Sequence, residues 1–269
     1  MPENLWTWKT FRRTLAATVM TSLSSIAAAD KFDDFHAAVF RSEDGGRLPY
    51  RLLVPAAAGA PSASPDTPAK KFPLLVFLHG AGERGDDNAK QLTWGADFLR
   101  TVAKEHGAFI LVPQCPAGQR WMEHSWDKTE INLPAAPSEP MALLLELIAS
   151  LRAEHPIDGD RLYAMGLSMG GMGTWDLVQR NPQMFAAAVV ICGGGDVSRA
   201  DRIKDLPLWV FHGEKDTVVP VQASRKMVAR LKELGSPVKY TEYPGVGHNS
   251  WSGAFEEDGL AKWLFSRGK

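Results

Sequence analysis

The chain has 269 residues, of which 45% are hydrophobic and 23% charged, so it contains enough apolar material for a sizeable folded core. Its 30 basic and 31 acidic residues give a formal net charge of −1, which argues against binding to nucleic acid through phosphate contacts. Two cysteines are too few for a disulfide framework or a zinc-ribbon site. These bounds favour a single-domain soluble protein.

Residues 1–29 have the pattern of a secretory signal peptide. Three basic residues between positions 9 and 13 precede an apolar stretch over residues 15–26, and three alanines then precede Asp30. The apolar stretch is short and contains several Ser and Thr residues, so we expect no stable insertion into a membrane. We predict a secreted or periplasmic protein whose residues 30–269 form one domain. A cytosolic amphipathic helix and a weakly matched twin-arginine signal are the alternatives.

Strand-like and helix-like stretches alternate along the rest of the chain. Residues 36–41 and 47–54 flank the turn Glu43-Asp44-Gly45-Gly46 and predict an antiparallel hairpin. Residues 55–70 are mostly Ala, Pro, Ser and Gly and predict a surface loop. Further strands are expected at residues 74–78, 109–112, 162–165, 187–191, 208–211 and 239–243, and helices at 141–155, 171–180 and 222–234.

This alternation predicts the α/β class, with a mainly parallel sheet that helices cover on both faces. The sequence contains no internal repeat and no second domain boundary. Ligand sites in such sheets gather where strands end and loops begin, so the residues that follow each strand are the candidates for function.

The predicted strand 162–165 runs directly into Gly166-Leu167-Ser168-Met169-Gly170, a Gly-x-Ser-x-Gly pattern before a predicted helix. The pattern is typical of a nucleophile elbow, a tight turn in which larger residues in place of the glycines would collide with neighbouring backbone. The turn would place the Ser168 hydroxyl at a helix N-terminus, where the helix dipole favours negative charge. We predict Ser168 as the nucleophile; the alternative is a Gly-rich turn with an incidental serine.

A serine nucleophile needs a base to take its proton. Two histidines, His212 and His248, follow Ser168 in the sequence. His248 lies in a loop directly after the last predicted strand, so that serine, acid and histidine can follow one another in the chain order that accompanies a nucleophile elbow, and we select it. A surface loop histidine is the alternative for this position. His212 lies at the end of the strand 208–211, and we interpret it as part of the scaffold.

The base needs a carboxylate that orients it. Asp216 follows the strand 208–211 in a turn, where its side chain can accept the ring N–H of His248. Glu214 and Asp196 are the alternatives for this role, because each also follows a predicted strand. Asp176 is disfavoured because it lies within the helix after Ser168.

An oxyanion hole is the remaining requirement for attack on a carbonyl group. The strand 74–78 ends in the Gly-rich stretch from His79 to Gly85, which can direct a backbone N–H at the serine. We predict the N–H groups of Ala81 and Met169 as the donors. Phosphate binding by this stretch is disfavoured because no Gly-Lys-Ser/Thr follows it. No cofactor and no metal are expected, because the seven histidines are scattered and no His-Glu-x-x-His occurs.

Taken together, these motifs resemble the α/β-hydrolase superfamily. The closer resemblance is to a group of secreted bacterial esterases, often labelled predicted peptidases, that are related to polyhydroxybutyrate-depolymerase-like and feruloyl-esterase-like enzymes. It covers most of residues 72–264 and is carried by residues 77–85, 166–176, 191–196, 209–221 and 240–251. The resemblance implies the α/β-hydrolase fold and a triad of Ser168, Asp216 and His248 that acts on ester bonds.

Two regions bear on the substrate. The stretch between Cys192 and Leu208 is short, so we expect no large lid there. The long loop over residues 113–140 contains Trp121 and Trp126, which we predict to contact substrate, with packing of the loop as the alternative.

Cys115 and Cys192 follow strands that are not neighbours in the expected strand order. A disulfide needs Cα atoms within about 7 Å, so we expect the two cysteines to lie too far apart to form one and both thiols to be free.

The expected function is that of a serine carboxylesterase that acts on a small-molecule ester without a cofactor. Short acyl chains or ester-substituted sugars and aromatics are the expected substrates. A serine peptidase with the same triad and a non-catalytic binding protein of the same fold are the alternatives. The sequence leaves the oligomeric state open.

Overall fold

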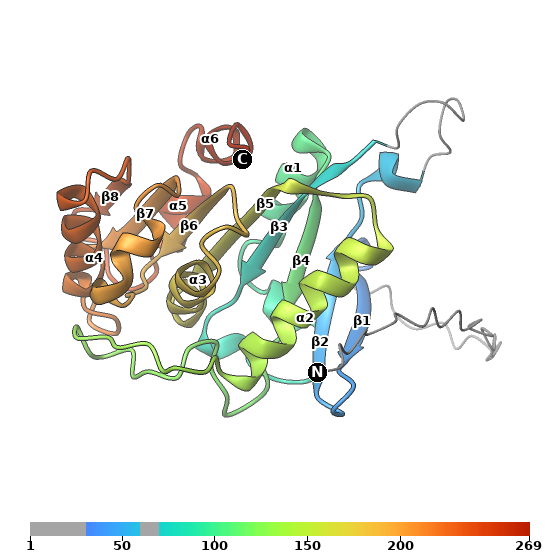
Figure 1. Cartoon of the computed structure of the whole chain (residues 1–269), viewed down its shortest axis with the longest axis horizontal. Helices are drawn as coiled ribbons and strands as arrows, with labels where there is room; N and C mark the ends of the chain where they lie inside the picture. The colour runs from blue at the N-terminus through green and yellow to red at the C-terminus, as the bar shows by residue number, and fades with distance from the viewer. Residues whose placement is uncertain (1–30, 60–69) are drawn as a thin grey trace, which may run out of the picture. The chain divides into compact units, whose positions relative to one another are not determined.

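An eight-stranded sheet forms the centre of the described part of the chain, residues 31–59 and 70–269 of the computed structural model (Figure 1). The strand order is β1-β2-β4-β3-β5-β6-β7-β8. The strands are β1 (His36–Arg41), β2 (Arg47–Leu53), β3 (Phe72–Leu78), β4 (Phe109–Pro113), β5 (Ile157–Leu167), β6 (Ala187–Ile191), β7 (Leu208–Gly213) and β8 (Lys239–Tyr243). The predicted signal peptide, residues 1–29, lies outside the described residues.

The pairing of the strands confirms the predicted hairpin and the mainly parallel sheet. β1 pairs with β2, and β2 with β4, in antiparallel register, whereas every pair from β4 to β8 is parallel. β5 begins at Ile157, five residues before the predicted start, because Ile157 pairs with Phe72 across a register shift in β3. Of the predicted loop 55–70, Ala56–Gly59 form the short 3-10 helix η1, and residues 60–69 lie outside the described residues.

Helices cover both faces of the sheet, as predicted. They are α1 (Ala96–His106), α2 (Glu139–Glu154), α3 (Met169–Arg180), α4 (Val221–Glu233), α5 (Trp251–Phe255) and α6 (Leu260–Phe265), with the 3-10 helices η2 (Ala81–Glu83), η3 (Lys90–Leu92) and η4 (Val197–Ile203). None of these helices is long and apolar enough to cross a membrane. α1, α5 and α6 were not among the predicted helices.

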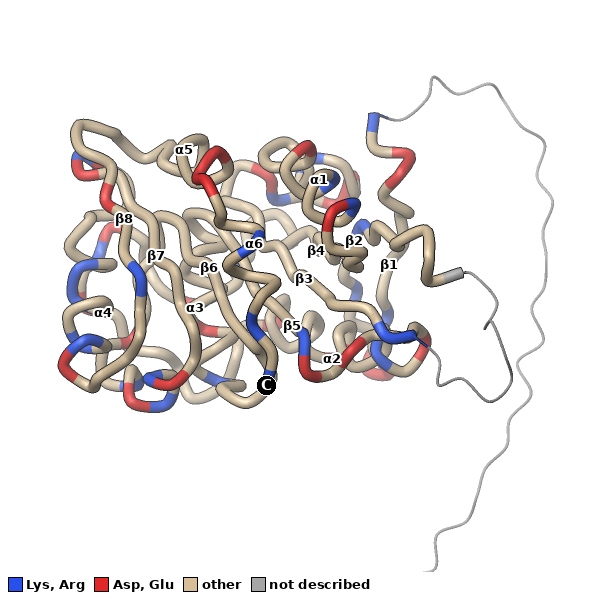
Figure 2. The backbone as a smooth tube through the Cα atoms, turned by 90° about the horizontal axis from the view of Figure 1, so that it is seen from above, with Lys and Arg blue, Asp and Glu red and all other residues tan. Residues whose placement is uncertain are grey.

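The core consists of two large apolar clusters, one on each face of the sheet. Alternate residues of β3 divide between them: Leu74 and Val76 pack with α2, α3 and α4, whereas Leu75 and Phe77 pack with α1, α5 and α6. Lys, Arg, Asp and Glu residues gather on the outer helices and connecting loops (Figure 2). The central strands β3 and β6 contain none, and in β5 they are confined to residues 158–161 at its start. This apolar centre is what the unbroken hydrophobic runs of the sequence predict.

Both cysteines are free, as predicted, and both are buried. Cys115 follows β4 and Cys192 follows β6, and two strands lie between β4 and β6 in the sheet.

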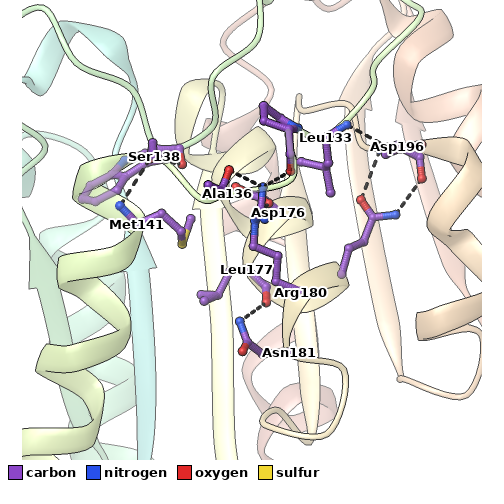
Figure 3. A network of polar contacts seen from close by, with 12 residues as sticks. Leu133, Ala136, Ser138, Met141, Asp176, Leu177, Arg180, Asn181 and Asp196 are labelled. Atoms are coloured by element: carbon purple, nitrogen blue, oxygen red, sulfur yellow. Dashed lines mark hydrogen bonds and ion pairs between the residues drawn. The ribbon is translucent and has the colours of Figure 1, made fainter.

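The long connection from β4 to α2 is anchored on α3 by a polar network (Figure 3). Arg180 donates hydrogen bonds to the carbonyl groups of three successive residues, 134–136, at 2.8–3.1 Å, while its Nε contacts Asp176 at 2.5 Å. Nearby, the carboxylate of Asp196 accepts the N–H of Leu133 at 2.9 Å. In this network the connection is therefore held through its own backbone groups.

Asp176 gives this network a pH dependence. Burial raises its pKa to about 6, against the opposing effect of Arg180, because the second carboxylate oxygen is buried with no hydrogen-bond partner. Between about pH 4 and pH 6 the folded state thus holds a proton that the unfolded chain has released. The contribution of this group to the free energy of unfolding falls as pH rises through that window, by up to about 3 kcal/mol.

We therefore expect Asp176→Asn to remove that fall. Urea unfolding of wild type and variant at pH 4, 5 and 6 measures the difference between their free energies of unfolding. As pH rises from 4 to 6, the free energy of unfolding of the variant should increase relative to that of wild type. A constant difference across this range would contradict the assignment.

Candidate active site

Ser168 occupies the turn between β5 and α3 in a backbone conformation that is strained for a residue with a side chain, φ 55° and ψ −119°. Glycines make room for this turn. A Cβ atom at Gly166 would lie 2.3 Å from the carbonyl oxygen of Gly170, and one at Gly170 would lie 1.9 Å from that of Leu78 in β3. The N–H of Ser168 donates to the carbonyl of Ile191 at 2.9 Å, which ties the turn to the end of β6.

The three side chains predicted for catalysis lie in one hydrogen-bonded row. Ser168 Oγ is 2.9 Å from His248 Nε2, and His248 Nδ1 is 2.7 Å from Asp216 Oδ2. Because the carboxylate can only accept, Nδ1 carries the hydrogen and Nε2 is left to accept from the serine hydroxyl. The residues come from the loops after β5, β7 and β8, three strand ends at the same edge of the sheet. This arrangement can take a proton from Ser168.

Asp216 is fixed by hydrogen bonds to both of its oxygens. Oδ1 accepts the N–H groups of Val218 and Val219 at 2.8 and 2.9 Å, and Oδ2 lies 3.2 Å from His212 Nε2 in addition to its contact with His248. Burial alone would raise the pKa of Asp216, but the hydrogen bonds from His212, His248 and the backbone outweigh it and hold the pKa well below its ordinary range. The carboxylate is therefore ionised at neutral pH.

The other acids considered from the sequence have different partners. Glu214 accepts the N–H of Gly245 at 2.8 Å and so braces the loop that carries His248. Asp196 accepts the N–H groups of Leu133 and Ser198. Asp216 is thus the acid that the structure brings to His248.

The two predicted oxyanion donors belong to two segments next to Ser168, the start of α3 and the start of η2. Met169 is the first residue of α3, so its N–H has no partner within the helix. Ala81 is the first residue of η2 and lines the same pocket as Ser168. A Cβ at the preceding Gly80 would be 3.0 Å from the side chain of Leu167 and 3.7 Å from Ser168 Cβ, which places this loop directly against the serine turn.

A cavity of about 210 Å³ opens beside Ser168. It is lined by Gly80, Ala81, Gly82, Glu83, Trp94, Trp126, Leu167, Ser168, Val218, His248 and Trp251. A larger cavity of about 530 Å³ lies between the end of β2 and α1, and none of the predicted site residues lines it.

Of the two tryptophans predicted to contact substrate, only Trp126 lines the cavity. The prediction for Trp121 is wrong, because its side chain is fully buried in the core. Trp121 Nε1 donates to the carbonyl of His79 at 3.3 Å. A Cβ atom added at Gly173 of α3 would lie 2.4 Å from the Cβ of Trp121. Trp121 therefore fixes the start of the long connection to the nucleophile helix.

Sequence reasoning missed two other tryptophans at the cavity. Trp94 is 45% exposed, an unusual value for so large an apolar side chain, and its ring lies 5.8 Å from that of Trp251. Trp251 stands at right angles to the His248 ring at 5.4 Å. The sequence held one signal for Trp251, its position three residues after the candidate base.

Among the described residues, three side chains of the kinds that can bind a metal ion lie close together. The ligand atoms of Cys192, Asp216 and His248 are within 4.8 Å of one another. Burial raises the pKa of the Cys192 thiol to about 12, so the thiol stays protonated at neutral pH, and the other two groups are hydrogen-bonded to each other. Hydrogen bonding within the site accounts for this cluster.

The family model described as phospholipase/carboxylesterase matches residues 62–258. The chain belongs to this family. The chain is 40% identical over 222 residues to acyl-protein thioesterase 1 from Neurospora crassa, in an alignment that covers 74% of this chain and 84% of that protein. It is also 30% identical over 136 residues to a poly(3-hydroxybutyrate) depolymerase from Ralstonia pickettii, which covers 49% of this chain and 28% of that protein.

Among solved structures, a thermostable esterase matches with a TM-score of 0.78 and 43% identity, covering 88% of this chain and 64% of that chain. These findings confirm the predicted fold and the resemblance to the esterase group of α/β-hydrolases. The chain spans only 21–28% of the length of several curated relatives that it matches.

The contact between Gly170 and Leu78 leads to a prediction about stability. Gly170→Ala would force a Cβ to within 1.9 Å of a backbone oxygen, so α3 and β3 must move apart. We expect the free energy of unfolding, measured in urea, to fall by about 3 kcal/mol or more. Gly82→Ala is the control, since its Cβ would meet nothing within 4 Å. Equal stability of the two variants would contradict the close approach.

Proposed function

We propose that this protein is a serine carboxylesterase that hydrolyses carboxylic esters through an acyl-enzyme intermediate. The observation that carries the proposal is the row of hydrogen bonds from Ser168 through His248 to Asp216, which ends in an open cavity. Membership of the phospholipase/carboxylesterase family and the 43% identity to a thermostable esterase support the same chemistry.

In the first half of the reaction, His248 Nε2 takes the proton of Ser168 as Oγ bonds to the ester carbonyl carbon. The carbonyl oxygen becomes an oxyanion, which the N–H groups of Ala81 and Met169 hold, and each such donor contributes about 3 kcal/mol. The imidazolium then gives its proton to the alcohol oxygen as the carbon–oxygen bond breaks. Asp216 stabilises the imidazolium because it is ionised and in direct contact with it.

The second half repeats these steps with water. His248 takes a proton from the water molecule while its oxygen bonds to the acyl carbon. The same imidazolium then returns the proton to Ser168 Oγ as the acyl–oxygen bond breaks, and the carboxylic acid leaves. Every proton is exchanged through His248 Nε2, so the reaction needs no cofactor.

The cavity supports small substrates. Its volume of about 210 Å³ and its tryptophan walls fit short acyl chains or an aromatic or sugar ring that lies against an indole. We propose such esters as the substrates. We also propose that residues 1–29 direct export and that residues 30–269 form the catalytic domain, on the basic, apolar and alanine-rich pattern of the N-terminus.

Thioesters are a second candidate class, because the chain is 40% identical to an acyl-protein thioesterase over most of its length. The same triad can cleave them, and a thiolate is a better leaving group than an alkoxide. Rates for ethyl butanoate and its matched thioester, compared at equal concentration, separate the two classes.

Ser168→Ala tests the nucleophile. The variant lacks the attacking oxygen, so kcat for 4-nitrophenyl butyrate should fall by about 10⁴-fold or more, and labelling by a fluorophosphonate probe should disappear. Ser266→Ala is the matched control, because its exposed hydroxyl donates to the carbonyl of Trp263 in α6 and lies outside the cavity. Retained activity in Ser168→Ala would overturn the proposal.

The tryptophan wall should set the preference for ring-bearing acyl groups. We expect Trp94→Leu and Trp126→Leu to lower kcat/KM for methyl 3-phenylpropanoate by about 3- to 10-fold and to leave methyl butanoate within about twofold, as measured in a pH-stat. Trp121→Leu is the contrast: it should lower the melting temperature and leave the ratio of the two substrates unchanged, because Trp121 is buried in the core. If the ratio of kcat/KM for the two esters is unchanged in all three variants, the tryptophans do not bind the substrate.

A further inference from the structure

A second histidine contacts the carboxylate of Asp216. His212 is fully buried at the end of β7, and its Nε2 lies 3.2 Å from Asp216 Oδ2. This is the same oxygen that accepts from His248 Nδ1 at 2.7 Å. Asp216 thus lies between two imidazole rings, one that faces the cavity and one that faces the interior.

The neighbours of His212 fix the hydrogen on Nε2. Besides Asp216 Oδ2, this nitrogen lies 2.9 Å from the carbonyl oxygen of Val219. Both neighbours can only accept hydrogen bonds, so Nε2 must carry a hydrogen and donate it toward them. His212 is therefore a donor to the carboxylate, not a passive neighbour.

The other ring nitrogen has two possible hydrogen-bonding arrangements. Nδ1 lies 2.7 Å from the hydroxyl of Ser224 in α4, which in turn lies 2.9 Å from the carbonyl oxygen of Gly193. When the hydroxyl donates to Nδ1, the ring is neutral; when it donates to Gly193, Nδ1 can carry a second hydrogen and the ring is a cation. The Gly193 carbonyl also accepts from Trp175 Nε1 at 3.2 Å, so it has a partner in both arrangements. A change of charge on His212 needs no movement of heavy atoms.

The charges around His212 come from three directions. Asp216 faces it from its own loop, and Glu242 stands opposite it on β8. Hydrogen bonds from Arg225 of α4 lower the pKa of Glu242, so this carboxylate is ionised and its partner is cationic at neutral pH. The remaining titratable neighbours are neutral there: burial raises the pKa of Cys192 to about 12, and that of Tyr240 also lies above its usual range because of burial.

We propose that His212 is a positioning residue of the active site, whose Nε2–H holds Asp216 Oδ2 in line with His248 and shares the negative charge of the carboxylate. This inference rests on the proposed esterase function. By taking part of that charge, His212 weakens the hold of Asp216 on the protonated form of His248.

Two amide variants of similar shape separate this role from simple packing. The amide nitrogen of His212→Gln can occupy the place of Nε2 and keep a donor to Asp216. The shorter His212→Asn places its amide near the position of Nδ1, so it reaches Ser224 and leaves Asp216 Oδ2 without the inner donor. The readouts are kcat and KM for 4-nitrophenyl butyrate from pH 5 to pH 9, normalised by fluorophosphonate titration of active sites, and the melting temperature.

We expect His212→Asn to lower kcat by about 10- to 100-fold with little change in KM, because a buried charged group has lost a hydrogen bond. The acid-side midpoint of its pH–rate profile should move to higher pH, since Asp216 then holds protonated His248 more strongly. His212→Gln should restore kcat to within a few fold of wild type and return most of the shift.

Equal losses in both variants that follow the melting temperature, with the midpoint unmoved, would overturn the inference and leave His212 a packing residue. If His212→Asn does not fold, His212→Met replaces it: this side chain has a length similar to that of Gln but no N–H to donate to Asp216, so the midpoint should again rise. An unmoved midpoint in this variant would be equally decisive. Ser168→Ala keeps the two proposals apart. If that variant is inactive and the midpoint does not move, only the role of His212 fails.

Discussion

The contact of three backbone segments at the Ser168 turn is the constraint on which the site depends. β3, the end of β6 and the first turn of α3 approach so closely that a Cβ at Gly170 would lie 1.9 Å from Leu78 O and one at Gly171 would lie 2.4 Å from Ile191 O. Only glycine permits that approach. These close contacts hold the turn in one conformation, so they can stabilise the strained backbone of Ser168 with its φ of 55°. They also leave the serine hydroxyl at the edge of the sheet.

The Asp216 carboxylate is the second feature on which the site depends, because its charge orients His248. A buried charge is costly unless it is fully hydrogen-bonded, and here two backbone N–H groups and two imidazoles surround it. The loop geometry therefore does two things at once: it keeps the carboxylate ionised, and it fixes which oxygen faces His248. A base with a defined tautomer follows from those contacts.

A feature could be predicted from the sequence where its pattern lies within a few neighbouring residues, and could not where it depends on contacts made only in the folded chain. The parallel strands and the serine turn were predictable because hydrophobic runs and the Gly-x-Ser-x-Gly spacing are read within a few residues. Helix α1 was missed although glycines in left-handed conformations, Gly95 and Gly107, bound it. Trp121 and Trp126 could not be told apart, since only the folded connection shows that Trp121 is fully buried against α3 whereas Trp126 is partly buried and lines the cavity. The contact of His212 with Asp216 is likewise a property of the folded loop, four residues apart in sequence but set by the turn between them.

The anchoring of the β4–α2 connection has a consequence for how the site can vary. Arg180 and Asp196 hold this connection through carbonyl groups and one N–H, contacts that any residue in the connection can make. Both anchors act on or next to α3, the helix that begins directly after Ser168. The wall that carries Trp126 and the nucleophile thus share one rigid support. Side chains of the wall that face the cavity, such as Trp126, can change without loss of these backbone anchors, so this architecture allows the substrate preference to vary while the geometry at Ser168 stays fixed.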